Sequence, residues 1–268
     1  MKTIALITGA SAGIGKETAK LLLQNGYTVY GAARRLNKME DLKGLKPIQM
    51  DVSEDASMVS AIEEIIKAEG RIDVLINNAG FGSYGALEDV SMNDARYQME
   101  VNVFGLARLT QLVLPHMRAQ QAGKIVNITS VGGKIANPLG GWYHASKFAV
   151  EALSDALRME VKPFGIDVIV IEPGGIKTEW ADIAGNNLRK VSGNTVYKHL
   201  VDKVETIFKK FNPKGSPTAV ISTLILKAIT VKNPKTRYHA GYMAGMILFM
   251  RKILSDKQFD KMIMSQLK

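Results

Sequence analysis

The sequence predicts a single α/β domain in which helices cover both faces of a parallel sheet. Short apolar runs bounded by turn residues alternate along the chain with longer stretches of helical periodicity. Strands separated by helices pair in parallel, and such a sheet is buried on both faces. The chain has 268 residues and 46% hydrophobic content, with no linker, repeat or low-complexity tract, which suits one large domain over residues 1–268.

The strands and helices follow one another in a regular order. We expect strands at residues 3–8, 28–32, 47–50, 72–76, 124–129 and 166–171. We expect helices at residues 14–24, 56–68, 91–119 and 143–162, with a short helix after residue 32. Beyond Glu172 the pattern is mostly helical, with one further strand at residues 236–239. Right-handed crossovers then give a Rossmann-type, doubly wound sheet followed by a mostly helical C-terminal extension.

Composition excludes several kinds of site. Cysteine is absent, so the chain has no disulfide and no thiol nucleophile, and the four histidines show no metal-ligand spacing. We therefore predict no bound metal, and a cytoplasmic location. The net charge of +10 is concentrated at the end of the chain, because residues 201–268 hold 13 Lys/Arg and four Asp/Glu, a balance of +9. No nucleic-acid module accompanies this charge, so we predict no nucleic-acid partner.

A glycine-rich turn joins the first strand to the first helix. Residues 8–15 read TGASAGIG, a spacing that departs from the common G-x-G-x-x-G pattern. Glycine at such a junction lets the backbone turn tightly and approach a pyrophosphate, whose charge is stabilised at the helix N-terminus. The position of the turn therefore predicts nucleotide binding by Gly9, Ser11, Gly13, Ile14 and Gly15.

Two arginines follow the second strand, where residues 31–35 read GAARR. NAD-binding folds usually carry an acidic residue there for the ribose hydroxyls, whereas arginine accommodates a 2′-phosphate. Alanine in place of the acid, followed by two guanidinium groups, favours NADP(H) over NAD(H), because arginine binds phosphate in a bidentate fashion. We expect at least one of Arg34 and Arg35 to contact the phosphate; the alternative is that they are solvated at a loop surface.

Tyr143 and Lys147 stand four residues apart on a predicted helix, and Ser130 follows the strand at residues 124–129. Residues at this spacing share one helix face, so both polar groups project into the same cleft. A tyrosine hydroxyl titrates near pH ~10, and becomes an acid/base catalyst when a neighbouring cation stabilises its phenolate. Ser130 could hold a substrate oxygen beside them. Tyr-x-x-x-Lys alone also occurs by chance on amphipathic helices.

In register over residues 3–180, the chain resembles the short-chain dehydrogenase/reductase family. The matching motifs are the TGASAGIG turn, Asp51-Val52, the NNAG segment at residues 77–80, Asn102, Ser130, the Tyr143/Lys147 pair and Pro173-Gly174. Each motif is modest by itself, whereas their joint order and spacing are specific. Over residues 1–175 the resemblance implies a cofactor-binding and catalytic core, and over residues 176–268 a substrate lid and C-terminal extension.

The resemblance implies contacts with the cofactor beyond the turn and the arginines. Asp51 would contact the adenine, although it could instead cap the following helix. Residues 78–80 would pass beside the adenine ribose, and residues 173–178 would frame the nicotinamide and its phosphate. The implied further cofactor-binding residues are Asp51, Val52, Asn78, Ala79, Gly80, Tyr143, Lys147, Pro173, Gly174, Ile176 and Thr178.

The catalytic roles also come from the resemblance. Tyr143 would give its proton to a carbonyl oxygen, and Lys147 would lower the tyrosine pKa and hold the nicotinamide ribose. Ser130 would polarise the substrate carbonyl. Asn102 would support a water that connects Lys147 to solvent, unless it merely bends or caps its helix. His144 points elsewhere from Tyr143 on a regular helix, so we assign it no role.

The last third of the chain is expected to select the substrate. The lid would span residues 176–201, with Trp180, Asn186, Asn187 and Leu188 as candidate lining residues. Trp142 could line the cleft or pack against it. The pattern at residues 115–118 and 146–161 is most similar to enzymes that reduce hydroxysteroids, retinoids and acyl-dihydroxyacetone-phosphate, which implies a hydrophobic ketone or aldehyde, or the corresponding alcohol.

The apolar segment at residues 241–250 is too short to cross a bilayer. Two interpretations stay open: it packs inside the protein or a dimer, or it rests weakly on a membrane surface with basic neighbours facing anionic lipid. The resemblance implies a homodimer or homotetramer through the helices at residues 91–119 and 142–162. Two alternatives to an NADP(H)-dependent oxidoreductase remain, namely NAD(H) use and a non-catalytic nucleotide-sensing protein.

Overall fold

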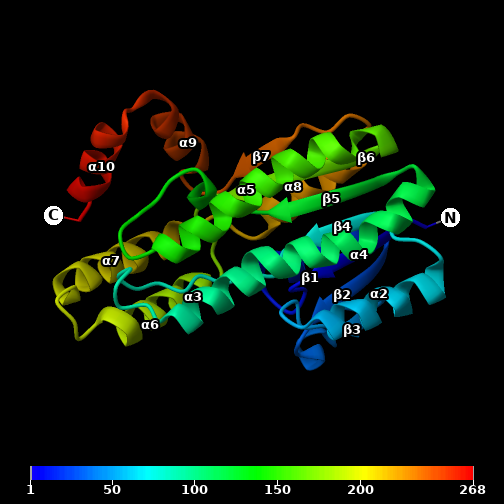
Figure 1. Cartoon of the computed structure of the whole chain (residues 1–268), viewed down its shortest axis with the longest axis horizontal. Coiled ribbons are helices and arrows are strands. Elements are labelled where there is room, and N and C mark those ends of the chain that lie inside the picture. The colour runs from blue at the N-terminus through cyan, green and yellow to red at the C-terminus, as the bar shows by residue number, and fades with distance from the viewer. Residues whose placement is uncertain (1, 268) are drawn as a thin grey trace.

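A seven-stranded parallel sheet forms the centre of the computed structural model, which describes residues 2–267 (Figure 1). Its strand order is β3-β2-β1-β4-β5-β6-β7, so the order reverses between β1 and β4. In such sheets a ligand binds at the carboxyl ends of the strands beside this reversal. The strands are β1 Ile4–Thr8, β2 Thr28–Ala33, β3 Lys46–Gln49, β4 Val74–Asn77, β5 Gly123–Ile128, β6 Ile166–Pro173 and β7 Arg237–Ala240.

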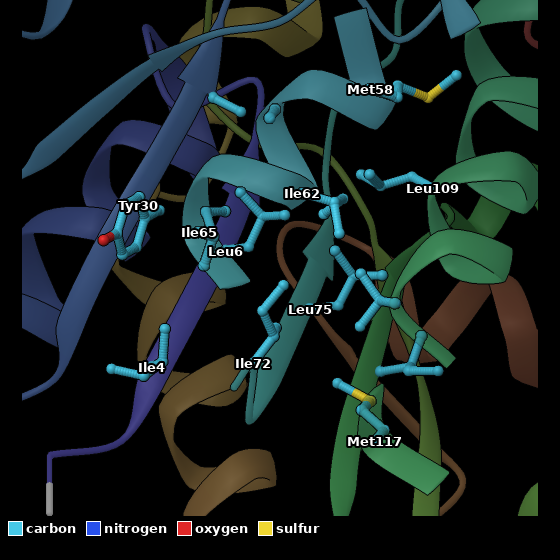
Figure 2. Packing of buried hydrophobic residues seen from close by; sticks show 14 of the residues in the cluster. Ile4, Leu6, Tyr30, Met58, Ile62, Ile65, Ile72, Leu75, Leu109 and Met117 are labelled. Atoms are coloured by element: carbon cyan, nitrogen blue, oxygen red, sulfur yellow. The ribbon is translucent and has the colours of Figure 1, made fainter. Parts of the chain in front are cut away.

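Helices cover both faces of the sheet. The helices are α1 Gly13–Gln24, α2 Asp55–Glu69, α3 Met92–Met99, α4 Gly105–Gln120, α5 Gly141–Val161, α6 Trp180–Ser192, α7 Lys198–Phe211, α8 Ala219–Thr230, α9 Ala244–Ile253 and α10 Asp256–Ser265. Side chains alternate along a strand, so Ile4 and Leu6 pack against α2 and α4, as Figure 2 shows, whereas Ala5 and Ile7 pack against α1 and α8. The predicted doubly wound α/β fold is confirmed.

The structure breaks the long helix that the sequence predicts at residues 91–119. A π-helical turn, Glu100–Phe104, separates α3 from α4. Gly105 begins α4 directly against the loop after β3, because a Cβ there would lie 2.1 Å from the Val52 carbonyl oxygen. The buried residues Gln98, Asn102, Leu106 and Leu109 keep a helical spacing of three to four residues through this region. The sequence pattern therefore could not reveal the break.

The C-terminal region is mostly helical, as expected, and its additional strand β7 lies one residue beyond the predicted position. The expected lid at residues 176–201 contains α6 and the start of α7. Helices α9 and α10 form an arm at the end of the molecule opposite the N-terminus (Figure 1). Within residues 2–267, no helix is both long enough and apolar enough to cross a bilayer.

Candidate active site

A cavity of about 740 Å³ lies at the carboxyl ends of the central strands. It brings together segments that are far apart in the sequence, from the turn after β1 to the segment after β6. The predicted site residues that line it are Gly9, Ser11, Gly13, Ile14, Arg34, Arg35, Asp51, Val52, Asn78, Ala79, Gly80, Ser130, Tyr143, Lys147, Pro173, Gly174, Ile176 and Thr178. Gly15 and Asn102 lie behind this lining rather than in it.

The turn after β1 has the backbone that a phosphate cradle requires. Gly9 and Gly13 adopt φ values of +67° and +54°, which side chains with a Cβ rarely tolerate. A Cβ at Gly15 would lie 2.4 Å from the Gly9 carbonyl oxygen. No side chain caps the N-terminus of α1, and its first turn carries no acidic residue. Its first backbone N–H groups and positive dipole therefore suit a nucleotide phosphate.

Asn78 fixes this turn to the end of β4. Its Nδ2 donates to the carbonyl oxygens of Thr8 at 2.9 Å and Gly9 at 3.3 Å. In return, the Thr8 hydroxyl accepts hydrogen bonds from the backbone N–H groups of Asn78 and Ala79 at 3.0 and 2.9 Å. These four bonds hold the ends of β1 and β4 in register at the strand reversal, and so shape the floor of the cavity.

Arg34 extends from the end of β2 over the cavity. Its Nη1 donates to the Tyr97 hydroxyl at 3.1 Å and lies 3.8 Å from the Asp51 carboxylate. Asp51 accepts hydrogen bonds from the Ser53 backbone and hydroxyl at 3.0 and 2.7 Å, whereas the N-cap of α2 is Glu54. The helix-cap interpretation of Asp51 is therefore wrong. A guanidinium that is 65% exposed at this edge is accessible to a phosphate group.

Ser130, Tyr143 and Lys147 meet at the far end of the cavity. The Ser130 hydroxyl accepts from the Gly132 N–H at 3.0 Å. Lys147 Nζ donates to the Ile128 carbonyl oxygen at 3.0 Å. Tyr143 and Lys147 are 7% and 8% exposed, so both polar groups work in a largely dry environment. The helix α5 supplies two of the three groups on one face, as the spacing predicts.

Burial dominates the titration of these groups. It raises the pKa of Tyr143 to about 12, and the hydrogen bond with Ser130 opposes this rise. It lowers the pKa of Lys147 to about 8, while the negative charge of Glu151 opposes that fall. At neutral pH Tyr143 therefore keeps its proton and can donate it, and Lys147 is mainly a cation.

Asn102 lies in the π-helical turn and joins three segments. Its Oδ1 accepts from the Phe81 N–H at 3.0 Å, and its Nδ2 donates to the Phe81 carbonyl oxygen at 2.9 Å and the Ser146 hydroxyl at 3.0 Å. A Cβ at Gly80 would lie 3.1 Å from Asn102 Oδ1 and 3.7 Å from Lys147 Nζ. Asn102 thus holds the segment after β4 against the helix that carries Tyr143 and Lys147.

His144 also belongs to the site, and the expectation that it points elsewhere is wrong. Its ring centroid lies 5.4 Å from that of Tyr143, and the side chain lines the cavity. Nδ1 lies 2.9 Å from the Gly132 carbonyl oxygen, and burial lowers the histidine pKa. The neutral His144 ring therefore donates from Nδ1 to the Gly132 carbonyl oxygen and holds that turn. The N–H of the same glycine donates to the Ser130 hydroxyl. Tyr143 and His144 both pack against the turn at Gly132, which helix spacing alone does not reveal.

An aromatic wall faces Tyr143. The Tyr84 and Trp180 rings lie 5.8 and 5.2 Å from the Tyr143 ring, and Phe208 lies 5.5 Å from Tyr84. All four side chains line the cavity. Trp180 is thus a lining residue as predicted, whereas Asn186, Asn187, Leu188 and Trp142 are not. Leu188 is fully buried in the core between α6 and α7, because the helical period turns it inward.

A buried pair of acids lies beneath the site. Glu151 on α5 accepts from the Thr129 hydroxyl at 2.7 Å and pairs with Lys134 at 2.7 Å and Arg237 at 3.0 Å. Glu172, the penultimate residue of β6, lies near the same cations, with Arg237 at 3.6 Å. Burial, followed by repulsion from Glu151, raises the pKa of Glu172 to about 7.

Glu172→Gln is expected to stabilise the protein increasingly as the pH rises. The folded-state pKa lies above the ordinary 4.5, so the stability contributed by the protonated carboxyl is complete below pH 4.5 and is lost towards pH 7. Glutamine stays neutral, so the variant and the wild type should have similar free energies of unfolding near pH ~5 and should diverge near pH ~8. Urea denaturation measures both. Exposed Glu63→Gln is the control, and a difference independent of pH would contradict the prediction.

Among residues 2–267, no group of three or more histidine or acidic side chains is arranged to hold a metal ion.

Comparison with known proteins gives consistent results. The family pattern described as short chain dehydrogenase matches residues 3–187. The 3-ketodihydrosphingosine reductase of Bacteroides thetaiotaomicron is 40% identical over 239 residues, which cover 89% of this chain and 87% of that protein. The NADPH-dependent 3-dehydrocapnine reductase of Ornithobacterium rhinotracheale is 34% identical over 284 aligned residues, covering 98% and 97% of the two chains.

Solved structures share the fold. A short-chain dehydrogenase from Streptomyces avermitilis superposes with a TM-score of 0.77 at 30% identity, covering 93% of this chain and 91% of that one. A short-chain dehydrogenase/reductase from Burkholderia phymatum in complex with NAD gives 0.79 at 25% identity, covering 94% and 92%. The family pattern and these extensive relatives show that the protein belongs to the short-chain dehydrogenase/reductase family of nicotinamide-dependent oxidoreductases.

Proposed function

We propose that the protein is an NADP(H)-dependent reductase of a ketone on a long-chain amphiphile. One observation carries the proposal: a single cavity joins a phosphate-binding turn and an exposed arginine at one end to a serine, a tyrosine and an aromatic wall at the other. The same arrangement fits the reverse oxidation of an alcohol. The intact group of Asn102, Ser130, Tyr143 and Lys147 argues against a non-catalytic nucleotide sensor.

In the proposed reaction, the chain positions the carbonyl and supplies its proton. The nicotinamide cofactor, when bound, supplies the hydride. The Ser130 hydroxyl polarises the carbonyl oxygen, and the Tyr143 hydroxyl donates its proton to that oxygen. The high pKa of Tyr143 keeps this proton in place until the oxygen becomes strongly basic. Lys147 holds the nicotinamide ribose and stabilises the tyrosinate that is left, and Asn102 supports the water that returns a proton to it.

The substrate class comes from the wall and from the relatives. Tyr84, Trp180 and Phe208 provide aromatic surface for an alkyl chain near Tyr143. The names of the two relatives indicate 3-ketones, and 3-ketodihydrosphingosine is a long-chain ketone with a polar head. We therefore expect a 3-keto group close to the polar end of a long alkyl chain, in preference to a steroid or retinoid.

A substrate screen that follows NADPH absorbance tests the proposal. The panel contains 3-ketodihydrosphingosine, 3-dehydrocapnine, steroid ketones, retinal and small aldehydes. Long-chain 3-ketones should exceed small aldehydes in kcat/KM by at least about a hundredfold, because each buried methylene contributes about 0.8 kcal/mol. Turnover of none of these compounds would contradict a reductase of hydrophobic carbonyls and favour the nucleotide-sensing alternative. Preferential turnover of steroids would change the substrate class only.

We also propose a homodimer through α4 and α5. Phe148 and Met159 are 45% and 69% exposed and lie eleven residues, about three turns, apart on one face of α5. Phe104, 56% exposed, precedes α4. A face of this kind is suited to a symmetric helix-to-helix contact, and a homotetramer would need a second surface.

Phe148→Ser combined with Met159→Ser is expected to convert the dimer into monomer. Sedimentation velocity should show the smaller species at concentrations where the wild type is dimeric, because loss of two apolar contacts weakens association by about a hundredfold or more. Val196→Ser removes an apolar side chain that is 89% exposed between α6 and α7, and serves as the control. A monomeric wild-type protein would contradict the proposal.

A further inference from the structure

Helix α9 has two different apolar faces. One face belongs to the body of the protein, because Ala244 is 1% exposed and Ile247 lines the active-site cavity. On the other face, Met246, Phe249 and Ile253 are 52%, 60% and 55% exposed. Their spacing of three and four residues places them on one stripe along the helix. The apolar segment therefore packs internally on one side only.

Basic side chains accompany the exposed stripe. Lys252 is exposed beside Ile253 at the end of α9, and Lys257 and Lys261 share an exposed face of α10 with Met264. None of these three lysines has an ion-pair partner among residues 2–267. Arg251, by contrast, pairs with Asp256 at 2.7 Å and lies over the Phe259 ring. The free positive charges are therefore available to an external anion.

Helix α9 borders the active-site cavity. Ile247 on its inner face lines the cavity, and so does Tyr242, two residues before the helix. Phe211 at the end of α7 lines it as well, with its ring 6.0 Å from that of Tyr242. A surface that docks on the exposed face of α9 therefore contacts a helix whose other face forms part of the cavity wall.

We propose that the exposed faces of α9 and α10, defined by Met246, Phe249, Lys252, Ile253, Lys257, Lys261 and Met264, dock on an anionic lipid bilayer. Apolar side chains flanked by lysines are the pattern of helices that lie in a membrane interface, with the side chains among the lipids and the charges on the headgroups. A second copy of this face would bring unpaired lysines together, which opposes self-association. The docking goes beyond the proposed reductase activity and does not depend on it.

Vesicle co-sedimentation tests the docking. The full-length protein is mixed with vesicles of phosphatidylcholine, with or without phosphatidylglycerol, at low and high salt. We expect binding to the anionic vesicles at low salt, and at least about a tenfold weakening in high salt, because screening removes the attraction of the lysines. Absence of binding to anionic vesicles at low salt overturns the proposal.

Two variants locate the contact. Met246→Ser combined with Phe249→Ser removes the apolar stripe. Lys252→Glu combined with Lys257→Glu and Lys261→Glu reverses the charge of the three lysines. Each should weaken vesicle binding by at least about tenfold, while circular dichroism confirms an unchanged fold. A matched control combines Lys43→Glu, Lys67→Glu and Lys227→Glu, three exposed lysines outside α9 and α10.

The controls separate the possible explanations. If the control triple variant loses binding as strongly as the α9–α10 variants, net charge alone is responsible and the proposed face is wrong. If the serine variant reduces the oligomer in sedimentation velocity without affecting vesicle binding, the face is a subunit contact and the proposal is again overturned. Selective loss of vesicle binding in both α9–α10 variants supports it.

Discussion

Tyr143→Phe is expected to lower kcat/KM for carbonyl reduction by about a thousandfold or more, with little change in the Kd for NADPH. The substitution removes one buried hydroxyl and leaves the ring in its packing against Trp180 and His144. A positioned general acid contributes about 10²–10⁴ in rate. Steady-state kinetics with the best ketone, and fluorescence titration with NADPH, measure the two quantities separately.

The matched control for this variant is Tyr30→Phe. Tyr30 is also buried, at 3% exposure, but it lies in the core on β2 and its hydroxyl donates to Glu69 at 2.8 Å. We expect a small loss of stability and unchanged kcat/KM. A kcat/KM of Tyr143→Phe within about tenfold of the wild-type value would contradict the proton-donor role, because removal of the general acid should slow the reaction by more than that.

Burial also changes the titration of Lys147. Lys147 has its pKa lowered to about 8 by burial, so it changes charge nearer to neutral pH than an exposed lysine does. This feature could not be predicted from the four-residue spacing, which places Lys147 on the tyrosine face of α5 but says nothing about its desolvation. The balance between burial and Glu151 depends on how tightly the surrounding segments close.

The fold was largely predictable because each strand is a short apolar run between turn residues, and helical crossovers between such strands give a parallel sheet with helices on both faces. The turn after β1, the end of β4 and Ser130 after β5 then necessarily meet at one edge of the sheet. The apolar pattern did not predict two local features, namely the π-helical turn and the direction of the His144 ring. The π-helical turn keeps its buried positions at helical spacing, and His144 reaches the site because the turn at Gly132 packs against its ring.

Contacts between elements that are far apart in the sequence could not be predicted from it either. Glu151 and Glu172 stand on α5 and β6, 21 positions apart, and neither belongs to a spacing with recognisable chemistry. Their proximity depends on how α5 packs over the sheet, and Arg237 joins them from β7. In the lid, residue types suggested which side chains line the cavity, but the rotation of α6 decides it: Trp180 faces the cavity and Leu188 faces the core.

Replacing both Arg34 and Arg35 with alanine is expected to raise the Kd for NADPH by about a hundredfold while changing the Kd for NADH by no more than about twofold. A hydrogen bond to a charged group contributes about 1.5–3 kcal/mol, and the two nucleotides differ only in the 2′-phosphate. At the end of β2 the native chain has alanine where NAD-binding folds usually carry an acid. No carboxylate at that position therefore repels the 2′-phosphate. Titration of each nucleotide into each variant measures the change.

The single variants assign the contact to one arginine. Arg34 is held by Tyr97 and lies 3.8 Å from Asp51, so a phosphate competes with the Asp51 carboxylate for its guanidinium. If the exposed end of Arg34 binds the phosphate, Arg34→Ala should cause most of the rise in the Kd for NADPH. If Arg35 binds it instead, Arg35→Ala should cause most of that rise. The control is Arg118→Ala. Arg118 lies beside Phe164 near the C-terminal end of α4. Equal loss of NADPH and NADH in the double variant would show that the arginines support the fold of the β2 loop rather than select the cofactor, and tighter wild-type binding of NADH than of NADPH would reverse the preference itself.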